Sequence, residues 1–206
     1  MKKLILASTS PRRRRLLEKF LGEELEVIAP EIDESKYRDL PPREQVKRIA
    51  LAKAESIASR ISGGVVVAAD TIVVIDGEVL GKPYTIEEAK SMLRKLSGRK
   101  HKVITGIAVI DVESGEKVID LVESEVLMRK LSELEIELYV RSGEPMGKAG
   151  GYAIQGLGAL LVKGISGCFY NVVGLPISRL YEILSRLGIN LLERAAETYG
   201  KACEGI

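Results

Sequence analysis

The sequence contains very little histidine and cysteine. There is one histidine, His101, and there are two cysteines, Cys168 and Cys203, in 206 residues. These counts argue against a disulfide framework, a Cys-x-x-Cys metal site and a histidine-rich zinc site. A Ser-His-Asp triad would have to rest on His101 alone. Any bound metal is therefore expected on oxygen ligands, which Mg²⁺ prefers.

An excess of charge of one sign and a long hydrophobic run are also missing. Lys and Arg number 31 against 29 Asp and Glu, for a net charge of +2, whereas proteins that wrap nucleic acid usually show a stronger or more segregated basic excess. Nucleic acid is therefore disfavoured as a partner, and any basic site must be local. The N-terminal run MKKLILAST is too short for a membrane span and lacks a signal-peptide pattern. We expect a cytoplasmic protein with no membrane partner.

One local concentration of positive charge is the run of four arginines, 12–15, in the stretch ILASTSPRRRRLLEKF. Ser10 and Pro11 are typical of the N-cap and first position of a helix, and Gly22 of its end. Cations near a helix N-terminus are unfavourable by about 0.3–1 kcal/mol each. Several arginines there indicate a nearby anion, and guanidinium groups match the oxygens of a polyphosphate.

Four successive helix residues cannot all face one ligand, because each is rotated by about 100° from the last. We assign Arg12 and Arg13, nearest the turn, to the phosphate groups. Arg14 and Arg15 are assigned to the solvated surface. The alternative is that the whole run is an exposed basic face or a nucleic-acid contact.

Apolar runs and helical periodicity alternate along the chain. Predicted strands lie within 3–8, 25–35, 63–83 and 101–128, and predicted helices cover 11–21, 43–61, 86–97, 133–140 and 177–187. This alternation favours an α/β or α+β fold with a mixed β-sheet. The residues after 192 are polar, and we expect them to pack late or fray.

Asp70 interrupts an apolar strand pattern, VVVAADTIVVI. A buried carboxylate costs free energy unless it is paired, hydrogen-bonded or bound to metal. Asp70 therefore caps a turn or pairs with an arginine, or else it binds a metal or activates water. The segment EIDES adds Glu31, Asp33 and Glu34, which either complete a magnesium site or form a surface loop.

Lys53 and Lys82 are each typical of surface lysines when taken singly. As a set, however, arginines, lysines and carboxylates without His or Cys ligands suit a magnesium-dependent phosphate enzyme. The pattern GxxxxGK[ST] is absent, which excludes a Walker-type NTPase. The glycines of AGGYAIQGLG place Gln155 in a backbone that a ligand can approach closely.

Five segments in order, LASTSPRRRRLL, AADTIVVIDGEVLGKP, LRKLSGRKHKVITGIAV, EPMGKAGGYAIQGLGALLVKGISG and NVVGLP, resemble the Maf family of nucleoside triphosphate pyrophosphatases. The resemblance covers nearly the whole chain, from about residue 4 to residue 187. It implies an α/β fold of the Maf/ITPase-like type, with a mixed, twisted β-sheet and flanking helices. The fold would be elongated, with two lobes around a nucleotide cleft formed by residues 1–192, followed by a polar tail, 193–206.

The resemblance also implies an activity and its residues. The family cleaves a nucleoside triphosphate to the monophosphate and pyrophosphate with a divalent cation, Mg²⁺ or Mn²⁺, and its members are often homodimers. Asp70 matches the family's general base, and Glu34 would join it in holding the metal, although the match can slip to Asp33. The residues implied to bind phosphate are Ser8, Arg12, Arg13, Lys53 and Lys82.

The substrate type is implied by fewer residues. The motif AGGYAIQG resembles the dTTP/UTP type, whereas the 7-methyl-GTP type has an acidic residue at the glutamine position. An amide offers a donor and an acceptor, which complement the N3–H and O4 of uracil or thymine. Arg12, Thr71 and Gln155 are therefore the predicted specificity residues. The motif EPMGKAG departs from the family's EPxDKAG, with Gly147 in place of the usual Asp, which puts a loop or metal contact in doubt.

Two other functions stay open at this point. One is a house-cleaning pyrophosphatase whose substrates are other modified nucleoside triphosphates. The other is a regulatory module that binds nucleotide or nucleic acid, in keeping with the family's proposed link to cell-division arrest.

Overall fold

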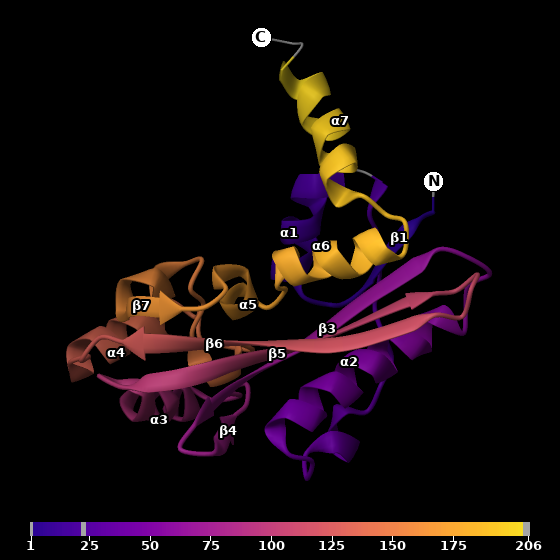
Figure 1. Cartoon of the computed structure of the whole chain (residues 1–206). Helices are drawn as coiled ribbons and strands as arrows, with labels where there is room; N and C mark the ends of the chain where they lie inside the picture. The colour runs from indigo at the N-terminus through magenta and orange to yellow at the C-terminus, as the bar shows by residue number, and fades with distance from the viewer. Residues whose placement is uncertain (1, 22–23, 204–206) are drawn as a thin grey trace. The chain divides into compact units, whose positions relative to one another are not determined.

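The computed structural model describes residues 2–21 and 24–203 (Figure 1). The strands are β1 (Leu4–Ala7), β2 (Glu26–Ile28), β3 (Val65–Ile75), β4 (Glu78–Leu80), β5 (Lys100–Asp111), β6 (Lys117–Met128) and β7 (Val162–Ser166). The α-helices are α1 (Pro11–Leu21), α2 (Pro42–Ala58), α3 (Ile86–Leu96), α4 (Glu133–Arg141), α5 (Phe169–Val173), α6 (Ile177–Arg186) and α7 (Leu191–Cys203). Gly22, the predicted end of the first helix, lies outside the described residues.

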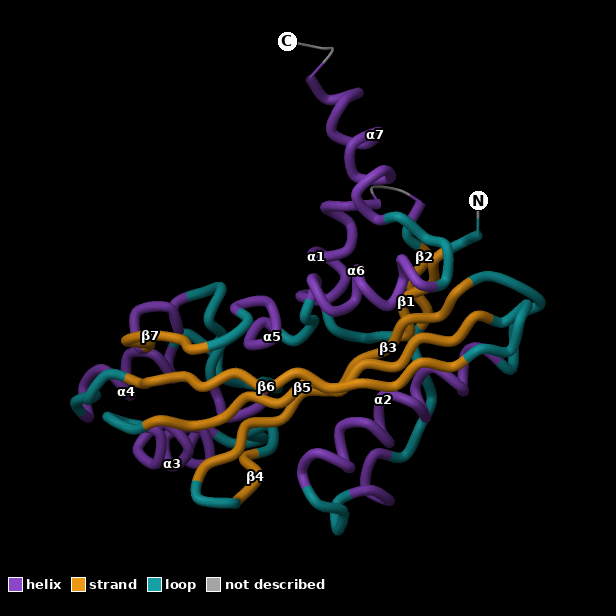
Figure 2. The backbone as a smooth tube through the Cα atoms, viewed as in Figure 1, coloured by secondary structure: helices purple, strands orange, loops and turns teal. Residues whose placement is uncertain are grey.

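The strands form one seven-stranded mixed sheet in the order β2-β1-β3-β5-β6-β7, with β4 paired to β3 (Figure 2). β1 is parallel to both β2 and β3, while β4 is antiparallel to β3 and β7 is antiparallel to β6. Both types of pairing are therefore present, and the predicted α/β fold with a mixed sheet is confirmed.

The predicted helices and strands are confirmed where the sequence carries local signals. Thr85 and Ser132 each form a capping box at the start of α3 and α4. Asp76 and Gly77, both with positive φ (52° and 81°), form the turn between β3 and β4. Asp70 does not break its strand, because β3 continues from Val65 to Ile75.

The segment 193–206, expected to be a polar tail, is helical as far as residue 203. Residues Leu191–Cys203 form α7, which packs against α1 and α6 (Figure 1). Leu191 and Ala195 are buried, and Asn190 Oδ1 accepts hydrogen bonds from the N–H groups of Leu192 and Glu193. The segment therefore has an N-cap and an apolar face, which make it a helix.

The fold divides into two compact units. Unit 1 comprises Met1–Asp70, Gly106–Leu121 and Gly174–Ile206, and unit 2 comprises Thr71–Thr105 and Val122–Val173. The long strands β3, β5 and β6 contribute residues to both units. Each unit has its own apolar core, which is described separately below.

In unit 1, α2 packs on one face of β1, β3 and β5. The buried residues of this layer alternate along the strands and recur at helical spacing in α2: Ile5, Ala7, Val66, Ala68, Ala108, Ile110, Ala50, Ala54 and Ile57. The alternate strand residues, such as Leu4, Leu6, Val65 and Val67, are also buried and point to the opposite face. Figure 1 shows α1 and α6 on that side.

In unit 2, α3 and α4 pack against each other and against the sheet. The core brings together Val73, Val103, Val126 and Met128 from the strands, Ala89, Leu93 and Leu96 from α3, and Ile136, Tyr139 and Val140 from α4. Tyr152 and Leu161, from the glycine-rich stretch, are buried in the same core. This stretch is therefore anchored on both sides of Gln155.

Among the helices that the structure describes, none is long and apolar enough to cross a membrane.

Candidate active site

The turn after β1 is shaped by backbone pairing with β2 and by the start of α1. Ser8 N–H donates to Ile28 O at 3.1 Å, and Ser8 Oγ accepts from Ser10 N–H at 3.1 Å. Ser10 caps the helix, because its carbonyl accepts from Arg14 N–H at 3.2 Å and its Oγ lies 3.5 Å from Arg13 N. Ser8 is 5% exposed at this edge of the sheet.

The parallel register brings three distant segments to the same edge of the sheet. Leu6 is paired with Val67, and Ala7 with Ile28. Ser8 therefore follows β1 at the level where Asp70 lies along β3 and where the chain leaves β2 toward Glu34. The carboxyl ends of parallel strands are the usual place for a ligand in an α/β sheet.

The four arginines of α1 differ in their exposure. Arg12 and Arg13 are partly buried, whereas Arg14 and Arg15 are exposed. Arg13 Nε donates to Gly174 O at 2.7 Å, which holds the guanidinium against the loop before α6. Arg14 Nε instead pairs with Glu18 Oε1 at 2.6 Å, one turn along the same helix. The helix rotation thus separates two partly buried arginines from two exposed arginines.

Lys53 stands between two carboxylates. Its Nζ lies 2.8 Å from Asp70 Oδ1 and 2.7 Å from Glu34 Oε1. The side chains of Lys53 and Asp70 are each 9% exposed, and that of Glu34 is 42% exposed. Asp70 is therefore paired with a lysine of α2. The sequence had suggested a pair with an arginine, or the capping of a turn, as the purely structural roles for this residue.

The structure also separates the acidic residues of EIDES. Asp33 Oδ1 accepts from the N–H and Oγ of Ser35, which caps the short 3₁₀ helix Glu34–Tyr37 and lowers the pKa of Asp33. Glu31 pairs with Arg60 at 3.0 Å and is exposed. Of the three, Glu34 is the one whose carboxylate lies within ion-pair distance of Lys53, at 2.7 Å.

The charges of this cluster act on one another. Burial lowers the pKa of the Arg13 guanidinium from its ordinary value, Asp70 and Glu34 oppose the shift, and Arg12 adds to it. An arginine nevertheless keeps its proton in a protein. Arg12, Arg13 and Lys53 carry three positive charges against the two negative charges of Asp70 and Glu34. The cluster therefore has a surplus of positive charge, which suits an anion.

A divalent cation fits the donor set to a limited extent. Asp70 and Glu34 offer two carboxylates that share one ammonium group, and no group of three or more His, Cys, Asp or Glu that could hold a metal exists in the part of the chain that the structure describes. Mg²⁺ is commonly held by one or two carboxylates together with substrate phosphates and water. Asp70 and Glu34, with arginines nearby, fit that pattern.

The other predicted residues, Thr71, Lys82 and Gln155, belong to unit 2. Thr71 Oγ1 and Thr105 Oγ1 share a hydrogen bond of 2.9 Å, and Thr105 Oγ1 donates to Asn171 O at 3.1 Å. Lys82 and Gln155 are exposed, and neither side chain is hydrogen-bonded to another residue that the structure describes. Their roles stay predictions from the family resemblance.

Several polar residues whose hydrogen bonds hold unit 2 together were not identified from the sequence. Asn171 is fully buried and donates to Val103 O and Ser124 Oγ, at 2.9 and 3.0 Å. Tyr139 and Glu144 bind the backbone around Gln155. A sequence signal existed for Glu144, because an acid in a glycine-rich stretch has several exposed N–H groups nearby.

Gly147 has a left-handed backbone conformation. Its φ is +69°, and nothing lies within 4 Å of the place where a Cβ would stand. An Asp there would meet no steric clash, and Asp is among the non-glycine residues that tolerate this conformation best. Replacement of the usual Asp by Gly therefore leaves the backbone of the EPMGKAG motif in an unstrained state.

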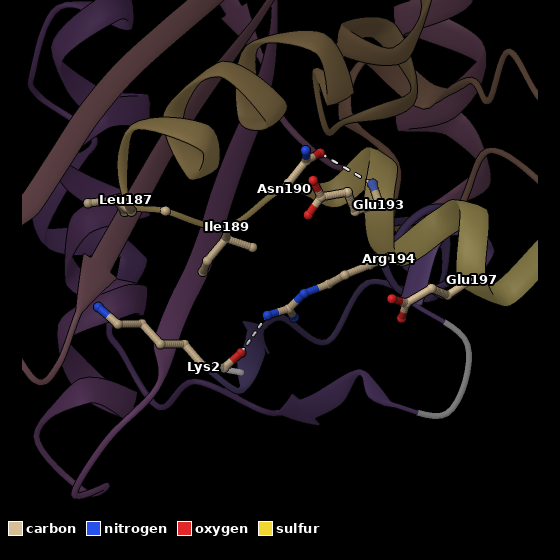
Figure 3. Close-up of a pocket in the computed structure, with 8 residues that line it drawn as sticks. Lys2, Leu187, Ile189, Asn190, Glu193, Arg194 and Glu197 are labelled. Atoms are coloured by element: carbon tan, nitrogen blue, oxygen red, sulfur yellow. Dashed lines mark hydrogen bonds between the residues drawn. The ribbon is translucent and has the colours of Figure 1, made fainter.

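A surface pocket of about 340 Å³ lies apart from this cluster, at the start of α7 (Figure 3). Its lining includes Lys2, Ile189, Asn190 and Arg194, and it contains none of the predicted site residues. Arg194 donates to Lys2 O at 2.8 Å, which joins α7 to the segment before β1. This hydrogen bond therefore holds α7 in place beside the pocket.

The fold and the cluster together define a class. The turn after β1, the arginine-bearing start of α1 and a lysine between two carboxylates gather positive charge on an α/β sheet, a combination suited to phosphate groups. The sequence pattern of the family described as Maf-like protein matches residues 3–187, and the chain belongs to that family.

Curated relatives match over nearly their full lengths. A protein of Methanococcoides burtonii is 45% identical over 193 residues, covering 94% of this chain and 99% of the relative. A protein of Pelotomaculum thermopropionicum is 46% identical, covering 93% and 100% of the two chains, and one of Symbiobacterium thermophilum is 48% identical, covering 91% and 95%. All three relatives are named dTTP/UTP pyrophosphatase.

Proposed function

We propose that this protein is a nucleoside triphosphate pyrophosphatase that hydrolyses dTTP and UTP to the monophosphate and pyrophosphate. The observation that carries the proposal is Lys53, held between Asp70 and Glu34 beside the arginines of α1. The names and near-full-length similarity of the relatives support the substrate class. The homodimer and the cytoplasmic location stay predictions.

Each residue has a defined part in the proposed reaction. Asp70 accepts a proton from the water that attacks the α-phosphorus, and the bond from that phosphorus to the bridging oxygen of the β-phosphate breaks. Pyrophosphate leaves with the electron pair of that bond. Ser8, Arg12, Arg13 and Lys53 stabilise the negative charge that develops on the phosphate oxygens, as fixed cations do in phosphoryl transfer generally.

Lys53 also has a positioning role in this proposal. Its 2.8 Å bond fixes the orientation of the Asp70 carboxylate, and its positive charge offsets the repulsion between the Asp70 and Glu34 carboxylates. When bound, Mg²⁺ or Mn²⁺ on Asp70 and Glu34 would neutralise triphosphate charge that repels a nucleophile. Lys82 is proposed as a further phosphate contact, and Arg12, Thr71 and Gln155 as residues that select the base.

The first experiment is a substrate panel. Natural and modified nucleoside triphosphates are supplied with Mg²⁺ or Mn²⁺, and released pyrophosphate is measured separately from single phosphate. We expect pyrophosphate mainly from dTTP and UTP, and its loss when a chelator removes the cation. Pyrophosphate from modified nucleotides alone would keep the chemistry and overturn the substrate, giving a house-cleaning enzyme. Absence of pyrophosphate from every nucleotide would overturn the enzyme.

The variant Asp70→Asn tests the proton acceptor. We expect turnover to fall by about 10²–10⁴-fold, the usual contribution of a general base, while nucleotide binding stays measurable. Asp76→Asn is the matched control, because Asp76 lies on the β3–β4 turn and pairs with Arg99 at 2.6 Å. Turnover of Asp70→Asn equal to that of the control would exclude Asp70 as the base.

A further inference from the structure

The segment that carries Gln155 is held by its backbone. Ala153 and Ile154, immediately before Gln155, are 8% and 9% exposed, whereas Gln155 itself is exposed. The chain then enters the short 3₁₀ helix Leu157–Leu161. An exposed glutamine side chain is thus presented from a backbone whose neighbours on both sides are fixed.

Tyr139 of α4 and Glu144 supply the fixing contacts. Ala153 N–H donates to Tyr139 Oη at 3.1 Å, two residues before Gln155. Leu157 N–H donates to Glu144 Oε1 at 3.0 Å, and Gly158 N–H donates to Glu144 Oε2 at 2.8 Å. Tyr139 Oη donates to Glu144 Oε2 at 2.8 Å, so the two side chains act as one unit.

The glycines of AGGYAIQGLG are explained by this arrangement. A Cβ on Gly156 would lie 1.7 Å from Glu144 Oε1. A Cβ on Gly158 would lie 2.6 Å from Ala153 O and 2.9 Å from Tyr139 Oη. These two glycines therefore allow the carboxylate and the hydroxyl to reach the backbone on either side of Gln155.

The protonated hydroxyl of Tyr139 strengthens the arrangement. Burial raises the pKa of Tyr139, and the hydrogen bond to Glu144 raises it further. The tyrosine therefore stays protonated and donates to the carboxylate. Hydrogen bonds to an ionised carboxylate are shorter and about twice as strong as neutral ones, so the loop is held more firmly than by neutral contacts.

We propose that Tyr139 and Glu144 are positioning residues for Gln155, which fix the loop so that its amide presents one orientation to the pyrimidine base. The proposal rests on the function proposed above, in which Gln155 reads the base. An amide distinguishes the O4 and N3–H of uracil from the amino group and bare N3 of cytosine only if its own donor and acceptor are fixed.

The test is the ratio of kcat/KM for UTP to that for CTP in the full chain. Tyr139→Phe removes one hydroxyl and keeps the ring in the core of unit 2. We expect this ratio to fall about tenfold, through a higher KM for UTP, with kcat for UTP changed less than about twofold. Glu144→Gln keeps the shape of the side chain and removes its charge, and we expect at least the same fall. Tyr181→Phe, the same change in α6, is the matched control.

The outcomes separate the two proposals. A general loss of structure would lower kcat for UTP and CTP together and leave the ratio unchanged, which overturns the positioning role. If the wild-type enzyme prefers UTP and both Tyr139→Phe and Glu144→Gln keep the wild-type ratio, the positioning role is overturned. The proposed substrate is unaffected by that result. A wild-type enzyme that releases pyrophosphate equally from UTP and CTP overturns both the positioning role and the proposed substrate. Recovery of the ratio by Glu144→Asp, relative to Glu144→Gln, would support the need for charge.

Discussion

At the scale of single residues, two buried side chains carry predictions of different kinds: Lys53, which lies between two carboxylates, and His101. Lys53 keeps Asp70 and Glu34 paired at one edge of the sheet. His101, the one histidine of the sequence, is 3% exposed and its Nε2 lies 2.7 Å from Tyr152 Oη. Lys53 and its two carboxylates belong to the proposed reaction. His101 instead affects the free energy of unfolding.

Burial lowers the pKa of His101 from 6.5 to about 4. The unfolded chain therefore binds more protons than the folded chain between pH 4 and 6.5, so stability rises with pH through this window. The contribution is complete above about pH 6.5 and is lost as the pH falls toward 4, with a total of about 3 kcal/mol. We expect the free energy of unfolding, measured by urea titration, to show this dependence.

The comparison variant is His101→Gln, which keeps a polar side chain but does not titrate. Both proteins contain the same carboxylates, so the contribution of these groups to the pH dependence cancels in the difference between the two unfolding free energies. We expect that difference to change in favour of the wild type as the pH rises from 4.5 to 6.5. Parallel stability curves for the two proteins would show that His101 titrates normally in the folded state.

At the scale of secondary-structure elements, the contact between α2 and β5 is unusually close. A Cβ on Gly106 would lie 2.4 Å from Val46 O and 2.5 Å from Val46 C, both backbone atoms of α2. Backbone atoms cannot move aside as a flexible side chain can. Because α2 also carries Lys53, the position of this helix affects both stability and the candidate site.

Gly106→Ala should therefore lower the free energy of unfolding by about 3 kcal/mol, the upper end of the usual cost of overpacking. Pyrophosphate release should fall with it, because α2 must shift and take Lys53 with it. Gly164→Ala in β7 is the control, since nothing lies within 4 Å of its Cβ position. Equal stabilities of the two variants in urea would contradict the close packing of α2 on β5.

At the scale of the whole molecule, the charge balance bears on the choice between enzyme and nucleic-acid-binding module. The net charge is only +2, and the cluster of Arg12, Arg13 and Lys53 with Asp70 and Glu34 carries a local surplus of one positive charge. A triphosphate occupies such a local site, whereas a duplex needs many phosphate contacts.

We expect no measurable binding of a short labelled duplex DNA at about 150 mM salt, measured by fluorescence anisotropy, while dTTP binds under the same conditions. A protein that makes about six or more phosphate contacts would lose about 10³-fold or more in affinity between 50 and 200 mM salt. Such a salt dependence for the duplex, with tight binding at low salt, would favour the regulatory module.

Much of the fold was predictable because its signals are local. The Ser-Pro start of α1, the capping boxes of α3 and α4 and the Asp-Gly turn after β3 each depend on residues within a few positions of one another. The helix α7 was missed, although Asn190 is a good N-cap and LLERAAE is rich in helix-forming residues. Polar residues are interspersed along this helix, so the few apolar residues that pack on α1 did not stand out in the sequence.

The sequence by itself determined most of the elements, the family and the chemical types gathered in the motifs, since capping, periodicity and motif spacing depend on residues close together in the chain. Only the tertiary structure decided that Glu34 rather than Asp33 meets Lys53 and that Asp70 pairs with this lysine. It also decided that Glu144 binds the backbone beside Gln155. These contacts join residues from different elements, and their partners are selected by sheet register and helix packing, which no local pattern specifies.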